Sequence, residues 1–146
     1  MRTEEKMSYY LTKAKTIENN FEKDIRIAVL SSFTLNGIEK VFEVKCAEKK
    51  IKCASYLGGY NQYNQELLDS GSDYYKFSPD ITFLIIDIRN FLGDYFYNSY
   101  DISDADRKLL AKQKITEIEN LVKNFQKYSN SKLIIANFNI PSYSPN

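Results

Sequence analysis

Two long apolar runs constrain the fold of this 146-residue chain more than any other feature. IRIAVLSSF begins at Ile25 and ITFLIIDI begins at Ile81, and each is apolar at nearly every position rather than at alternate ones. Such runs are typical of strands that are buried on both faces of a parallel sheet. KLIIANF, from Lys132, predicts a further strand, and IKCASYL, from Ile51, predicts a shorter one.

Segments with helical periodicity alternate with these strands. Across residues 3–21, 38–49 and 103–129, apolar residues recur at spacings of three or four. Strands that alternate with helices imply right-handed crossovers and a doubly wound parallel sheet with helices on both faces. We therefore expect an α/β fold of three layers, with strand order 2-1-3-4 and an added N-terminal helix.

Local patterns predict helix ends and inward faces. Asn36 and Glu39 have the spacing of a capping pair before the second helical segment. YNQYNQELL predicts a turn of helix in which Leu67 and Leu68 both point inward. In the third segment, the residues expected to face the core are Ile115, Ile118, Val122 and Phe125.

The composition excludes several classes of function. There is no His, so no Ser-His-Asp relay and no His-ligated metal can exist within this chain. The formal net charge is +1, which gives no general attraction to nucleic acid or to an anionic membrane, and no apolar run approaches the roughly 20 residues that span a bilayer. Cys46 and Cys53 suit free thiols in a reducing compartment, with a disulfide as the less favoured alternative. We expect a cytoplasmic protein that binds no metal, nucleic acid or membrane.

In a doubly wound sheet, ligands bind beyond the carboxyl ends of the strands, at the point between the first and third strands where the strand order reverses. This rule selects the candidate ligand-binding residues, which are Ser31, Ser32, Gly59, Asn61, Asp87, Arg89 and Asn90. Neither GxGxxG nor GxxxxGK follows the first strand, so no phosphate-binding loop is expected. A phosphoacceptor role for Asp87 would need acidic residues after the first strand to hold magnesium, and serines stand there instead.

Ser32 is the catalytic candidate if the chain has one. A serine after the first strand and the amide of Gly58 or Gly59 after the second are the layout of an ester hydrolase. However, a serine hydroxyl is a weak nucleophile without a neighbouring base. The alternative is that Ser31 and Ser32 turn the chain into the next helix. Arg89 would suit a phosphate or carboxylate, and its alternative is an ion pair with Asp87.

Three stretches of the chain resemble one known family. They are IAVLSSFTLNGIEKVFEV, LGGYNQYNQELLDSGSDYYKFSPDITFLIIDIRNFLGD and KLIIANFNIPSYSP. From about Ile25 to Pro145 the chain is similar to the N-terminal, SGNH-like domain of FkbH-like proteins in the haloacid-dehalogenase superfamily. The resemblance implies a flavodoxin-like, SGNH-like fold for residues 24–146 after a packed helix in residues 1–23. It also implies a fragment of a longer protein, truncated before the last strand of its sheet.

In that family a magnesium-dependent haloacid-dehalogenase domain follows, and the best-known members dephosphorylate a glyceryl phosphate donor and load the glyceryl group onto an acyl carrier protein. Its DxDxT motif is absent here. The resemblance therefore implies a non-catalytic binding or positioning domain without a cofactor of its own, whose partners are the catalytic domain and acyl carrier protein. Residual hydrolysis by Ser32 is one alternative. A homodimer is another, since eight of the twelve tyrosines lie between Tyr56 and Tyr100.

Overall fold

Four parallel strands form a single sheet in the computed structural model, which describes residues 6–17, 22–98 and 102–138. The strands are β1 (Ile25–Ser31), β2 (Cys53–Leu57), β3 (Ile81–Ile85) and β4 (Lys132–Ile135). They are hydrogen-bonded in the order β2-β1-β3-β4, and every neighbouring pair is parallel. The predicted α/β class and strand order are confirmed.

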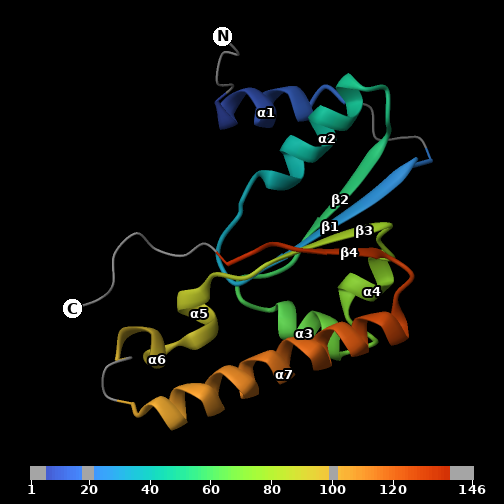
Figure 1. Ribbon diagram of the computed structural model, residues 1–146. Coiled ribbons are helices and arrows are strands. Elements are labelled where there is room, and N and C mark those ends of the chain that lie inside the picture. Colours follow the sequence, from blue (N-terminus) through green and yellow to red (C-terminus); the bar gives the residue numbers. More distant parts are fainter. Residues whose placement is uncertain (1–5, 18–21, 99–101, 139–146) are drawn as a thin grey trace.

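Helices cover both faces of this sheet. Within the described ranges they are α1 (Met7–Ala14), α2 (Ile38–Glu48), α3 (Tyr63–Leu68), α4 (Asp73–Phe77), α5 (Ile88–Leu92), α6 (Asp94–Tyr97) and α7 (Asp104–Tyr128). Figure 1 shows α1 and α2 on one side of the sheet and the other helices on the opposite side. The sheet is therefore the middle of three layers, and the expected N-terminal helix is present as α1, which packs on α2.

β1 contributes side chains to both faces of the sheet, since successive side chains of a strand point to opposite faces. Ala28 and Leu30 join the main core, which residues of α3, α4, α5 and α7 complete. Val29 is paired in register with Phe83 of β3, and Phe83 stacks on Phe42 of α2 with ring centroids 5.4 Å apart. One strand thus contributes to both interfaces between the sheet and its helices.

The start of α2 differs from the predicted capping pair. Its N-cap is Gly37 rather than Asn36, with a left-handed φ of 93° that glycine adopts without strain. The Glu39 side chain accepts the Gly37 N–H at 2.9 Å. The acidic half of the pair is therefore correct, but the cap lies one residue later. Within the described residues, the expected N-terminal helix of residues 3–21 ends early, since α1 spans Met7–Ala14; residues 3–5 and 18–21 lie outside the described ranges.

Two predicted core positions are wrong. Leu67 is fully buried, whereas Leu68 is 56% exposed, because the short helix α3 turns only one face toward the core. Ile115 is 60% exposed, because the inner face of α7 at this level is formed by its half-buried neighbours Lys114 and Ile118. Phe125 is in the core and Ile118 packs against it, as predicted, and Leu121 is a further core residue of α7 that was not predicted.

A chain of buried hydroxyl groups ties β3 to the elements on either side of it. Tyr74 of α4 and Thr82 of β3 share a hydrogen bond of 2.8 Å between their hydroxyl oxygens. Thr82 shares another of 2.8 Å with the hydroxyl of Ser131, just before β4. All three residues are buried. Each hydroxyl therefore depends on its neighbour for the hydrogen bonds that water would otherwise supply.

We predict that Thr82→Val lowers the free energy of unfolding by about 1–3 kcal/mol, because it leaves buried hydroxyl groups without their partner while keeping the side-chain shape. Urea denaturation measures the change. The control is Thr116→Val on α7, an exposed position whose hydroxyl bonds only to the Lys112 carbonyl at 3.0 Å, and it should change stability by less than about 0.5 kcal/mol. Equal effects of the two substitutions would contradict the role of the buried chain.

Candidate functional site

The carboxyl ends of β1 and β3 are joined through Ser32. Its backbone N–H donates to the Ile85 carbonyl at 3.1 Å, which continues the ladder past the last residue of β1. Its hydroxyl oxygen accepts the backbone N–H of Asp87 at 2.8 Å. Ser32 is only 1% exposed. The side chain therefore fastens the two strand ends together, and its hydroxyl does not face solvent.

Ser31 has a similar local role. It is 2% exposed, and its hydroxyl donates to the carbonyl of Phe33 two residues later. This contact holds the turn that leaves β1. Both serines thus fit the structural interpretation that the sequence left open, in which they turn the chain out of the strand toward α2.

The residues after β2 lie along the same edge of the sheet. The Gly58 N–H donates to the Val29 carbonyl at 2.9 Å, so this amide belongs to the pairing of β1 with β2. The Gly59 carbonyl accepts the Gln62 N–H at 3.1 Å in the turn before α3. Asn61, in that turn, is exposed and has a left-handed φ of 53°. Of the two glycine amides considered for an oxyanion, that of Gly58 is occupied by the sheet.

Asp87 and Arg89 form a paired unit at the start of α5. The guanidinium of Arg89 donates from Nε to Oδ1 at 2.9 Å and from Nη2 to Oδ2 at 2.6 Å. Asp87 also caps α5 by accepting the Arg89 backbone N–H at 2.8 Å. These bonds, with the side-chain bond from Arg89 as the largest cause, hold the pKa of the Asp87 carboxyl below its ordinary value. The ion pair that the sequence analysis gave as the alternative for Arg89 is present.

The predicted site residues therefore divide into two groups. Ser32, Asp87 and Arg89 are connected by hydrogen bonds, and Asn90 follows them as an exposed residue of α5. Gly59 and Asn61 belong to the turn after β2, on the other side of β1. The exposed polar groups of this edge are thus the side chains on α5 and Asn61, while the serines lie beneath.

Glu66 of α3 is a polar residue that the sequence analysis did not select. Its Oε1 accepts the Tyr56 hydroxyl at 2.6 Å, and its Oε2 accepts the Tyr74 backbone N–H at 3.1 Å. Burial, followed by the contact with Glu66, raises the pKa of Tyr56 above its ordinary value. The signal in the sequence that could have revealed Glu66 is its position on the inner side of the YNQYNQELL segment. Glu66 joins α3 and α4 to β2.

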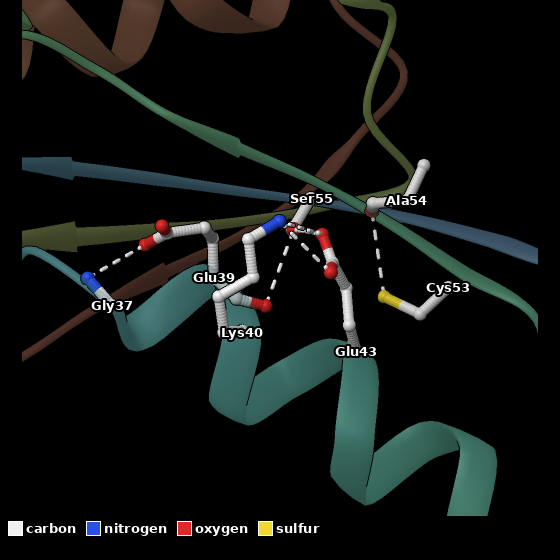
Figure 2. A network of polar contacts seen from close by, with 7 residues as sticks. All are labelled: Gly37, Glu39, Lys40, Glu43, Cys53, Ala54 and Ser55. Atoms are coloured by element: carbon white, nitrogen blue, oxygen red, sulfur yellow. Dashed lines mark hydrogen bonds and ion pairs between the residues drawn. The ribbon is translucent and has the colours of Figure 1, made fainter. Parts of the chain in front are cut away.

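A second unselected network joins α2 to β2 (Figure 2). The Ser55 hydroxyl donates to Glu43 Oε1 at 2.6 Å, and Lys40 Nζ lies 3.0 Å from the Oε2 of the same carboxylate. The sequence gives no signal for this contact, because Glu43 looks like any other charged residue of an amphipathic helix.

The tyrosine-rich region is divided between the core and the surface. Tyr63 and Tyr74 belong to the main core, and Tyr56 and Tyr75 pack against it. Among the described residues of this set, the exposed members are Tyr60, Tyr95 and Tyr97, and Tyr100 lies outside the described ranges. Only part of the described tyrosines is therefore available to a partner.

An open hollow of about 640 Å³ lies beside α3 and α4 and begins at the turn after β2. Its lining is rich in amides and carboxylates and consists of Gln62, Asn64, Gln65, Glu66, Leu68, Asp69, Ser72 and Asp73. The described residues contain no group of three or more His, Cys, Asp or Glu side chains that could hold a metal ion. No helix in the described ranges is both long and apolar enough to cross a membrane.

We predict that Ser32→Ala lowers the free energy of unfolding by about 1–3 kcal/mol, because the Asp87 N–H loses its acceptor in a part-buried hydrogen bond. Urea denaturation again provides the measurement. Ser70→Ala, at an exposed turn residue, is the matched control and should stay within about 0.5 kcal/mol of the parent. An unchanged stability in Ser32→Ala would show that the hydroxyl does not fasten the strand ends.

Comparisons with known proteins agree with this fold. No curated protein matches the chain. The chain is similar to a crystal structure of the N-terminal part of the protein BF1531 from Bacteroides fragilis, which contains a phosphatase domain complexed with Mg; the TM-score is 0.71 and the identity 17%. The match covers 94% of this chain and 35% of that one, so this chain spans about a third of that length. The family model "FkbH, N-terminal domain" matches residues 26–142, and the chain therefore belongs to the FkbH N-terminal domain family.

Proposed function

We propose that this chain is a non-catalytic accessory domain that binds or positions a partner for a haloacid-dehalogenase-type phosphatase domain of a longer protein. Membership of the FkbH N-terminal domain family supports the accessory role. The phosphatase domain in the structurally similar protein supports a linked catalytic partner. By resemblance, the longer protein would dephosphorylate a glyceryl phosphate donor and transfer the glyceryl group to acyl carrier protein in the cytoplasm. The magnesium ion of that chemistry would belong to the catalytic domain.

The environment of Ser32 is the observation that carries the non-catalytic assignment. A serine nucleophile must reach the substrate and needs a base that removes its proton. Ser32 is buried and accepts a backbone N–H, and the chain contains no His. An SGNH-like arrangement of the strands would then serve as a scaffold, with the serine as a structural residue.

The first turn of α5 is the surface that we propose for the partner. Its Arg89 side chain is 46% exposed while it is paired with Asp87, and Asn90 beside it is exposed. A guanidinium makes strong, charge-assisted hydrogen bonds to phosphate and carboxylate groups. Acyl carrier protein with its phosphopantetheine arm, or a phosphorylated three-carbon acid, would supply such groups. Asn61 lies at the same edge of the sheet and would add an amide.

An NMR titration of the ¹⁵N-labelled chain with phosphopantetheinylated acyl carrier protein, and separately with phosphoglycerate, tests this function. We expect shifts of the backbone amides at residues 58–61 and 87–90 with at least one of the two. Arg89→Gln should reduce the affinity several-fold, because it removes the charge that meets the anion.

Arg107→Gln is the matched control. Its side chain is 47% exposed and pairs with an aspartate, Asp104, at 3.5 Å, but it belongs to α7 rather than to the first turn of α5. The control should bind as the parent does. An absence of shifts with both ligands, shifts confined to other surfaces, or equal losses in the two variants would each overturn the proposed site.

A further inference from the structure

One hydrogen bond sets the register between α2 and β2. The Ser55 hydroxyl donates to Glu43 Oε1 at 2.6 Å and lies 3.3 Å from the Glu39 carbonyl oxygen (Figure 2). The face of β2 that carries Ser55 therefore looks onto the face of α2 that carries Glu39 and Glu43. This face of α2 continues toward the end of the helix at residues three or four further on.

The same register brings the two cysteines together. Cys53 precedes Ser55 by two residues and so lies on the same face of β2, and Figure 2 shows its side chain on the α2 side of the strand. Cys46 follows Glu43 by three residues and so lies on the same face of α2. α2 and β2 therefore run in opposite directions, so the start of β2 lies beside the end of α2. In keeping with this placement, Cys46 is among the neighbours that raise the pKa of the Cys53 thiol.

The connection between α2 and β2 is tight enough to keep the two cysteines on facing segments. The helix ends at Glu48, and Lys50 takes a left-handed φ of 61° that reverses the chain. The Ile51 N–H then returns to the Cys46 carbonyl at 2.9 Å. The backbone therefore holds the start of β2 against the last turn of α2.

The two thiols differ in access. Cys46 is half-buried, whereas Cys53 is 7% exposed. Burial is the largest cause that raises the pKa of the Cys53 thiol to about 12, with the neighbouring Cys46 as a further cause. A dissolved reagent therefore reaches Cys46 first, because Cys46 is the more exposed of the two thiols. These are the chain's two cysteines, so each has the other as its intramolecular partner.

We propose that Cys46 and Cys53 are a site of reversible oxidation, at which a small-molecule disulfide such as oxidised glutathione closes an intramolecular disulfide between α2 and β2. The Cys46 thiolate attacks one sulfur of oxidised glutathione, which forms a mixed disulfide and releases a glutathione thiolate that takes up the Cys46 proton. Cys53 then loses its proton and attacks the Cys46 sulfur, and the second glutathione leaves with that proton. Two protein thiols lose two electrons, and one oxidised glutathione becomes two reduced molecules.

The new bond would link the last turn of α2 to the first residue of β2, which is paired in register with Ile25 of β1. A cross-link restricts the unfolded chain, and it should therefore raise the melting temperature by a few degrees when the native geometry tolerates it. The inference does not depend on the proposed accessory function, because it concerns the opposite end of α2 from the strand-end site.

The test incubates the reduced 146-residue chain with excess oxidised glutathione and examines it by intact mass and peptide mapping. We expect the main product to have lost two hydrogens, to retain no glutathione, and to yield linked peptides that contain Cys46 and Cys53. Cys53→Ser should keep one glutathione on Cys46, because no second thiol displaces it. Cys46→Ser should stay largely unmodified, because Cys53 is buried.

Three results with the parent chain would overturn the proposal. They are a stable mixed disulfide at Cys46, two unreacted thiols, and a disulfide-linked dimer on a non-reducing gel. All three are read from the parent protein, so the conclusion holds even if a serine variant fails to fold. Recovery of both thiols with dithiothreitol would support reversibility, and failure to recover them would contradict it.

Discussion

Burial of β1 on both faces is the constraint on which the rest of the structure depends. Ala28, Val29 and Leu30 are 1% exposed or less, although their side chains point alternately to the two faces. Helices must therefore cover both faces of the sheet. The chain achieves this by crossing over through α2 on one face before β2 and through α3 and α4 on the other before β3. The order β2-β1-β3-β4 follows, with β1 and β3 inside and the other two strands at the edges.

The same burial decides what the strand-end residues can do. It continues into Ser31 and Ser32, whose hydroxyls must find partners inside the protein, since an unpaired buried polar group costs about 1–3 kcal/mol. They find them in the backbone of Phe33 and Asp87. Arg89, on the turn of helix that follows, remains partly exposed. Ser31 and Ser32 are thus structural residues, while the neighbouring helix carries the exposed polar side chains of this edge.

The sheet could be predicted from sequence, because uninterrupted apolar runs such as that from Ile81 belong to central strands and the helical segments leave few ways to connect them. Details that depend on distant partners could not. Ser32 and Asp87 are 55 positions apart, so nothing local revealed their hydrogen bond. The exposure of Ile115 depends on which face of α7 meets α5, where Lys114 lies over the Phe91 ring, and periodicity alone did not reveal that contact. The SGNH-like character and the domain boundary at residue 23 stay predictions.

The central claim is that Ser32 is a structural residue and not a nucleophile. A fluorophosphonate probe tests this most directly, because it phosphonylates serines that an active site activates and leaves ordinary serines unmodified. The folded chain should show no adduct at Ser32 by peptide mapping, even after long incubation at neutral pH. Labelling of Ser32 that disappears when the protein is unfolded beforehand would reveal an activated hydroxyl and contradict the account.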